Sequence, residues 1–327
     1  MKIETTLSGS YPKLPTEPGA SNVRVVRNRM DQGKATERDL SEAIVETTRR
    51  VLALQDSAGI DIPVDGQVAW DDEQTYVARA LQGFEIAGLI RYLDTNTYYR
   101  QPEIVGPIAW TKPILVEEWK RAQGMARRPV KAVLPGPYSL YRFSKDRHYK
   151  DPAEALRDLG AAIAREVKSL EDAGATWIHF EEPWVGRARA EDAALIQAAL
   201  SPVFAGRTAK TVLHVPFRAP TAVFPALCEL GWSVLGLDLV GAPEAWELIP
   251  RMPHGRTVAL GLIDARNTKL EDAAKVAQAV ARARSKRSDL TWQLCPTASL
   301  EYLPADKAAL KVSRLVEAAR LASRNGG

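Results

Sequence analysis

Polar side chains recur at one kind of position in this chain, directly after short apolar runs. They supply hydroxyl, carboxylate, amide, imidazole and guanidinium groups, which together can bind a small molecule and move a proton. In chain order these positions are Ser8, Ser10, Asp65, Gln67, Glu181, Glu182, His214, Asp238, Asp264, Arg266, Cys295, Thr297 and Ser299. Because a packed core has no structural need for so many polar groups, the pattern predicts a functional site.

The apolar runs that precede these residues alternate with longer stretches of helical periodicity. Candidate strands lie at residues 3–10, 60–67, 130–137, 176–183, 211–217, 233–240, 257–264 and 290–299. Helical spacing of three, four and four residues is clearest within residues 151–173, at Leu156, Leu159, Ile163 and Val167. Eight such β/α units predict an α/β fold of the (β/α)8 TIM-barrel type.

A closed barrel is favoured over an open doubly wound sheet, because no Gly-x-Gly-x-x-Gly follows the first candidate strand. In a barrel the C-terminal ends of all strands meet at one rim, so the scattered polar residues are expected to converge there. We predict one domain over residues 1–327, with an inserted hairpin-like segment at about 84–111. This aromatic insertion is either a substrate cover or a surface or dimer contact.

Composition narrows the classes of function. The chain has 327 residues, of which 46% are hydrophobic, and its 44 basic against 40 acidic residues give a formal charge of +4 without a basic block. These values predict a small-molecule substrate and exclude nucleic acid as a partner. No apolar run reaches the length of about 20 residues that a membrane span needs. Two cysteines and an N-terminus without signal-peptide features predict a cytoplasmic protein, and a homo-oligomer stays open.

Three of the polar residues, Glu181, Glu182 and His214, have more than one possible role. Glu181 and Glu182 are adjacent, and because side chains alternate along a strand, only one of them can face the barrel axis. His214 lies in an apolar run, where a histidine is either a hydrogen-bonded core residue or, at a strand end, a functional group. The position favours the functional interpretation.

Several motifs, in this order, resemble the catalytic barrel of cobalamin-independent methionine synthase in a single-barrel form. They are TTLSGSYP at residues 5–12, VDGQ at 64–67, PVKAVLPGPYSL at 129–140, LEDAGATWIHFEEPW at 170–184 and ALGLIDARNTKLED at 259–272. The resemblance covers nearly the whole chain. It implies the barrel fold that this family shares with uroporphyrinogen decarboxylase.

The resemblance also implies a catalytic zinc, held by a His-x-Cys pair, a Glu and a second Cys. The pair falls on His214 and Pro216, the Glu position on Asp238, and the second Cys on Ala298. Both thiolates are therefore absent, and one imidazole with one carboxylate is fewer than the three protein ligands usual for a catalytic zinc. We predict no metal site, with Cys295 as an alternative ligand only if the last strand is displaced.

The family's substrate-binding positions have changed as well. Its Glu that pairs with the homocysteine ammonium falls at Gln67, and the Asp that assists it falls at Glu181. Its proton-donating His falls at Arg266, which binds carboxylates but cannot act as an acid near neutral pH. Its folate-stacking Trp falls at Phe143, so a folate-type methyl donor stays open while the cofactor itself is not identified. These changes predict an anionic substrate other than homocysteine.

The leading hypothesis is an enzyme that transfers a methyl or other small group on such an anionic molecule. In it His214 is the general acid/base, Asp238 orients His214, and Glu181, with Gln67, holds the polar groups of the substrate. The predicted substrate-binding residues are Ser8, Ser10, Gln67, Phe143 and Arg266. The alternatives are a metal-free lyase or decarboxylase on the same fold, and a non-catalytic binding protein.

Overall fold

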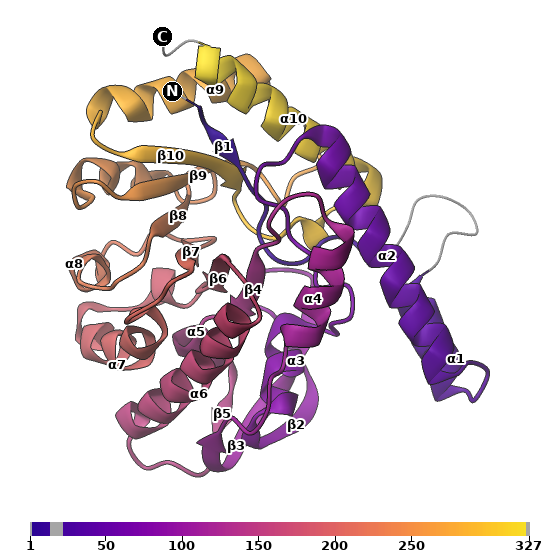
Figure 1. Ribbon diagram of the computed structural model, residues 1–327. Coiled ribbons are helices and arrows are strands. Elements are labelled where there is room, and N and C mark those ends of the chain that lie inside the picture. The colour runs from indigo at the N-terminus through magenta and orange to yellow at the C-terminus, as the bar shows by residue number, and fades with distance from the viewer. Residues whose placement is uncertain (1, 14–21, 325–327) are drawn as a thin grey trace.

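The computed structural model describes residues 2–13 and 22–324, and its centre is a curled parallel sheet (Figure 1). The sheet runs in the order β1-β10-β9-β8-β7-β6-β4. Its strands are β1 (Glu4–Thr5), β4 (Ala132–Pro135), β6 (Trp177–Glu181), β7 (Lys210–Val215), β8 (Val234–Asp238), β9 (Thr257–Ile263) and β10 (Thr291–Pro296). Strands β6 and β8 are buried along their whole length, as expected for parallel strands covered on both faces.

The segment 62–64 closes the sheet into a barrel of eight members. Single parallel bridges join Thr6 to Ile62 and Val64 to Lys131, which places this segment between β1 and β4. Closure of a parallel β/α sheet in this way confirms the predicted barrel class.

The eighth member is shorter than the sequence predicts, for a reason that lies in its own residues. Pro63 has no N–H group and so cannot continue a regular ladder. The side-chain amide of Gln55 takes the place of a neighbouring strand: its Oε1 accepts from the Val64 N–H at 2.9 Å, and its Nε2 donates to the Val64 carbonyl at 2.7 Å. A buried helix side chain therefore completes the hydrogen bonding of this member.

Helices surround the curled sheet (Figure 1). They are α1 (Val23–Asp31), α2 (Glu37–Ala58), α3 (Glu73–Ala80), α4 (Val116–Met125), α5 (Pro137–Phe143), α6 (Pro152–Asp172), α7 (Ala193–Phe204), α8 (Phe224–Cys228), α9 (Ala273–Lys286) and α10 (Ala305–Arg324). Short 3-10 turns lie at η1 (Val185–Arg187), η2 (Ala190–Asp192), η3 (Pro243–Glu247), η4 (Ile249–Arg251) and η5 (Leu300–Tyr302). No helix in the described ranges is long and apolar enough to cross a membrane.

Helix α6 confirms the periodicity found in the sequence. Asp151 begins it by accepting from the Ala153 N–H, and Pro152 occupies the first turn. The stripe of Leu156, Leu159, Ile163 and Val167 is fully buried against the barrel, while Glu154, Arg157, Arg165 and Lys168 are exposed.

An antiparallel hairpin interrupts the β/α repeat between α3 and α4. It consists of β2 (Gln82–Arg91) and β3 (Tyr98–Ala109), with the short β5 (Lys145–Asp146) added beside β3. Strand β3 packs against α3 and α6, and the buried Tyr99 hydroxyl donates to the Phe143 carbonyl at 2.9 Å. These contacts fix the turn of the hairpin, residues 92–97, relative to the barrel.

Candidate functional site

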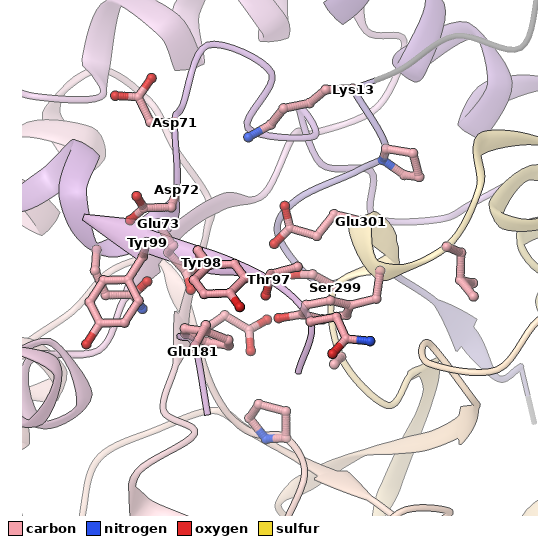
Figure 2. A pocket seen from close by; sticks show the side chains of 18 of the residues that line it. Lys13, Asp71, Asp72, Glu73, Thr97, Tyr98, Tyr99, Glu181, Ser299 and Glu301 are labelled. Atoms are coloured by element: carbon pink, nitrogen blue, oxygen red, sulfur yellow. The ribbon is translucent and has the colours of Figure 1, made fainter. Parts of the chain in front are cut away.

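The polar strand ends surround a cavity of about 470 Å³ (Figure 2). Its walls come from the segment after β1, the start of α3, the turn of the hairpin, Glu181 at the end of β6, the residues after β7 and the residues after β10. We call this cavity the mouth pocket. It lies where the C-terminal ends of the strands meet, the position at which barrel enzymes carry their chemistry.

Among the charged side chains that line the mouth pocket, acidic ones outnumber basic ones. The acidic residues are Asp71, Asp72, Glu73, Glu181 and Glu301, and the basic ones are Lys13 and Arg24. The lining therefore does not supply the excess of positive charge that an anionic substrate, as expected from the sequence, would favour.

Glu73 and Glu301 lack enough counter-charge around them. Burial raises the pKa of Glu73 well above its ordinary value, and the nearby carboxylates Glu181 and Glu301 raise it further. Burial likewise raises the pKa of Glu301, with Lys13 acting in the opposite direction. The buried Oε1 atom of Glu73 has no hydrogen-bond partner within the described residues. The surroundings thus disfavour the ionised form of both groups, and a cation bound beside them would favour it.

Glu181 lies at the floor of the mouth pocket between two histidines. Its Oε1 is 2.9 Å from His179 Nε2 and its Oε2 is 2.8 Å from His214 Nδ1. All three side chains are buried. We call this group the His-Glu-His cluster.

The cluster holds Glu181 as a carboxylate. Burial opposes this, but the two imidazoles outweigh it and set the pKa of Glu181 well below its ordinary range. Burial alone would lower the pKa of His214, yet Glu181 and the Cys295 thiol raise it to about 10. Burial and the Lys131 ammonium lower the pKa of His179 to about 3. The two rings therefore differ in charge although both contact the same carboxylate.

The predicted pairing of His214 with Asp238 is wrong. The Asp238 carboxylate accepts from the backbone N–H groups of Phe217, Val240 and Gly241 at 3.2, 3.0 and 2.6 Å. In the β7–β8 register His214 lies opposite Gly236, so Asp238 lies two residues, or about 7 Å, further along the barrel. Asp238 fixes the loop after β8, and Glu181 is the group that orients His214.

His214 itself does not line the mouth pocket within the part of the chain that the structure describes. It is 1% exposed, and the member of the cluster that reaches the cavity is Glu181. A direct role for His214 as the acid or base on a substrate is therefore not supported by its position.

Glu182 points away from the barrel axis, as the alternation of side chains along β6 predicts. Its carboxylate accepts from the N–H groups of Tyr138 and Ser139 at 3.0 and 2.8 Å and from the Ser139 hydroxyl at 2.5 Å. It thus caps the start of α5. A side chain at Gly136 would overlap this carboxylate, so the backbone there requires glycine.

The three small polar residues predicted to bind substrate form a buried layer beneath the pocket. The Ser10 hydroxyl donates to Gln67 Oε1 at 2.6 Å, and the Ser10 N–H donates to Ser299 Oγ at 3.2 Å. Ser8 Oγ is buried and has no partner within residues 2–13 and 22–324. Of this layer only Ser299 lines the mouth pocket, so Ser8, Ser10 and Gln67 support the site from below.

Phe143 and Arg266 do not take their predicted places. Phe143 ends α5, is 3% exposed, and stacks on Tyr92 with ring centroids 4.9 Å apart, so no ring face is left in the mouth pocket for a folate. Arg266 is exposed, and its guanidinium lies over the Phe217 ring. It lines a neighbouring cavity that shares Glu301 and Tyr302 with the mouth pocket. Arg266 is thus a residue of the outer rim.

Sequence reasoning missed Glu73, Glu301 and His179. His179 precedes Glu181 by two residues, and since strand side chains repeat with period two, the sequence did contain a sign that both share a face. Glu301 lies two residues after Ser299, the residue that ends the last predicted strand. Glu73 lies at the start of a helix, and no periodicity in the sequence places it beside the barrel mouth.

The sequence matches a known family over almost its whole length. The model of the catalytic domain of cobalamin-independent synthase matches residues 3–321. The chain belongs to this family. The family is one of methyl-transfer enzymes, and its assignment confirms the resemblance drawn from the motifs.

Curated relatives and a solved structure are similar over almost the whole chain. The methionine synthase of Saccharolobus solfataricus is 27% identical over 321 residues, 98% of this chain and 94% of the relative. That of Sulfurisphaera tokodaii is 28% identical, covering 98% of this chain and 92% of the relative. The structure of a B12-independent methionine synthase from Shewanella sp. W3-18-1 in complex with selenomethionine superposes with a TM-score of 0.86 at 22% identity, covering 99% of both chains. At that identity the superposition supports the fold alone.

The zinc site that the resemblance implies does not fit the residues at its positions. Only His214 and Asp238 carry donor atoms, and these contact Glu181 and backbone N–H groups, respectively. Pro216 and Ala298, at the positions of the two thiolates, line the mouth pocket with groups that cannot bind a metal. The residues at these four positions therefore do not form the zinc site that the resemblance implies.

Proposed function

We propose that the protein transfers a methyl or similarly small group on a small molecule that carries a protonated amine. The observation that carries this proposal is the acidic lining of the mouth pocket, above all the under-compensated carboxylates of Glu73 and Glu301. A positively charged substrate replaces the anionic one expected from the sequence. Transfer of a small group follows from membership of the family.

An ammonium group supplies what the two carboxylates lack. Buried carboxylates are costly unless they are paired, and Glu73 Oε1 has no partner among the described residues. Figure 2 shows Glu181 and Glu301 directed toward the same space. An amine in that space donates to Glu73 and Glu301, and the Phe217 and Tyr302 rings that line the cavity add aromatic surface beside the cation.

The same pocket supports an acceptor other than a metal-activated thiol. Pro216 and Ala298 lie at the positions where the resemblance implies thiolates, and both face the cavity. An apolar wall of this kind packs against a substrate but does not ionise it. Tyr98, on the hairpin, also lines the pocket and offers the ring face for a folate-type methyl donor that Phe143 does not.

The test is equilibrium binding of three probes at equal ionic strength: 1,4-diaminobutane, L-homocysteine and glutarate. We expect the diamine to bind and glutarate not to bind. Glu301→Gln removes the charge but keeps the shape, and we expect it to weaken diamine binding about tenfold or more, because one charge-assisted hydrogen bond is lost. Asp71→Asn is the matched control, because Asp71 also lines the pocket but is paired with Arg27 and Arg79.

Comparison of the three probes separates the proposal from its alternatives. Tighter binding of glutarate than of the diamine would overturn the proposal and favour a decarboxylase acting on an anion. Binding of homocysteine that is as tight as that of the diamine, with methyl transfer to its sulfur from a deuteromethyl-labelled folate detected by mass spectrometry, would return the protein to the ordinary reaction of the relatives. Group transfer to 1,4-diaminobutane, but not to the sulfur of homocysteine, in the same assay supports the proposal.

A further inference from the structure

We propose that His179, Glu181 and His214 bind one divalent transition-metal ion. The ligand set is two imidazoles and one carboxylate. It shares His214 with the zinc set that the family resemblance implies, but it replaces Pro216, Asp238 and Ala298 with His179 and Glu181. The inference stands on the geometry of the cluster and does not depend on the proposed function.

The spacing of the donor atoms suits one ion. One donor atom from each residue lies within 4.8 Å of the other two. The two direct nitrogen-to-oxygen distances are 2.9 and 2.8 Å. Metal–nitrogen and metal–oxygen bonds of about 2.0–2.2 Å place neighbouring ligands of one ion about 3 Å apart, so the cluster needs little movement to close around a cation.

Regular backbone structure sets this geometry. His179 and Glu181 are two residues apart on β6 and therefore share a face. Glu181 lies directly opposite His214 in the parallel β6–β7 ladder. Because two neighbouring strands of a closed barrel position all three residues, the site is rigid, as a metal site of defined geometry requires.

The near nitrogens, His179 Nε2 and His214 Nδ1, are hydrogen-bonded to Glu181, so a metal ion would take the place of the proton in each of these two contacts. His179 Nδ1 and His214 Nε2 are buried and have no hydrogen-bond partner within the described part of the chain. Each ring proton can therefore reside on the far nitrogen while the near nitrogen binds the metal. The Cys295 thiol acts electrostatically on His214 and is the group beside that ring which can fix the tautomer.

Access and charge also favour a cation. Glu181 lines the mouth pocket, so an ion can enter from there and keep open coordination positions toward the cavity. The carboxylates of Glu73, Glu181 and Glu301 act on one another in this region. The buried Lys131 ammonium acts in the opposite direction.

The experiment is a titration of chelator-treated full-length protein with Co²⁺, followed by its visible d–d absorption. We expect one Co²⁺ per chain. His179→Gln keeps a hydrogen-bond donor for Glu181 but removes the imidazole, and we expect it to weaken Co²⁺ binding at least about 100-fold. His254→Gln is the matched control: His254 is exposed and pairs with Asp289 away from the cluster, so binding should not change.

Asp238→Asn separates this site from the one implied by the resemblance. We expect it to leave Co²⁺ binding unchanged, because Asp238 belongs to the loop after β8. Loss of binding in Asp238→Asn together with normal binding in His179→Gln would overturn the proposal. So would the absence of saturable binding with a Kd below about 1 mM.

If His179→Gln does not fold, as judged by circular dichroism, Glu181→Gln provides the same test, because Glu181 belongs to the proposed ligand set and not to the zinc set that the resemblance implies. Elemental analysis of protein purified without chelator distinguishes zinc from iron as the resident ion, and either one supports the site. These measurements do not involve an amine ligand, so failure of this inference and failure of the proposed function are distinguishable.

Discussion

Two buried lysines with different partners allow a direct test of the electrostatics inside this barrel. Lys131 is 1% exposed, donates to the Thr6 hydroxyl at 2.8 Å, and forms no ion pair in the described ranges. Lys311 is 0% exposed and donates to the Glu271 carboxylate at 2.7 Å. We expect Lys131→Met to stabilise the protein and Lys311→Met to destabilise it.

The magnitude follows from the charge of Lys131. Burial lowers the pKa of Lys131 from 10.5 to about 8, against the opposing effect of Cys295 and Glu181. A pKa lowered by one unit corresponds to about 1.4 kcal/mol, so keeping Lys131 protonated lowers the free energy of unfolding by about 3 kcal/mol below pH 8. Loss of the hydrogen bond to Thr6 costs about 1 kcal/mol. Lys131→Met should therefore gain about 2 kcal/mol at pH 7, or about 4 °C in Tm.

The pH dependence gives the sign of the effect independently. The pKa of Lys131 is lower in the folded than in the unfolded state, so the unfolded chain binds the proton more tightly between pH 8 and 10.5. The free energy of unfolding of the unmodified protein therefore rises over that interval, as Lys131 loses its proton. The extra stability of Lys131→Met over the unmodified protein should vanish near pH 10. By contrast, Lys311→Met leaves Glu271 without its cation and should cost about 3 kcal/mol.

The assay is urea unfolding of both variants and the parent at pH 7 and pH 10, followed by circular dichroism. A loss of stability in Lys131→Met at pH 7, or a gain that does not change with pH, would refute this account. In either case Lys131 would have a counter-charge that its surroundings do not reveal.

Two further variants and one control variant test the packing that positions the site. Phe143→Ala should lower the free energy of unfolding, measured in urea, by about 3–5 kcal/mol, because it removes the ring that packs against Tyr92 and Tyr99 of the hairpin. A loss below about 1 kcal/mol would mean that the hairpin is not anchored there. Gly160→Ala should lower the Tm measurably, because the new Cβ would lie 2.5 Å from the Ala199 carbonyl oxygen of α7. The control is Gly124→Ala on the exposed face of α4, which should be neutral or stabilising by up to about 1 kcal/mol. Equal effects of the two substitutions would contradict the close approach of α6 and α7.

The sequence was sufficient for the barrel and for helix α6, because both depend on periodicity that any buried face must have. Leu156, Leu159 and Ile163 recur at helical spacing whatever lies opposite them. It was not sufficient for the closing member at 62–64, where the Gln55 side chain replaces a ladder that Pro63 prevents. That substitution depends on a contact between a helix and a strand, which periodicity does not encode.

The candidate site, like the fold, could be predicted only in part from the sequence. The sequence placed Glu181 and His214 at neighbouring strand ends, and the structure joins them at 2.8 Å. It could not place Asp238, because the relative register of two strands decides whether it meets His214 or the loop. Nor could it give the sign of the substrate charge, because Glu73 and Glu301 reach the cavity from a helix start and a 3-10 turn.

The hairpin divides the site into a fixed part and an exchangeable part. Glu181 belongs to a barrel strand, whereas Tyr92, Thr97 and Tyr98 reach the mouth pocket from an insertion outside the eight-membered barrel. A loop carried on its own pair of strands can change length or composition without disturbing the barrel that supports the reaction. Evolution of substrate preference in this architecture can therefore proceed by changes at exposed positions of the hairpin such as Tyr98, at little cost to folding, while the chemistry is inherited unchanged.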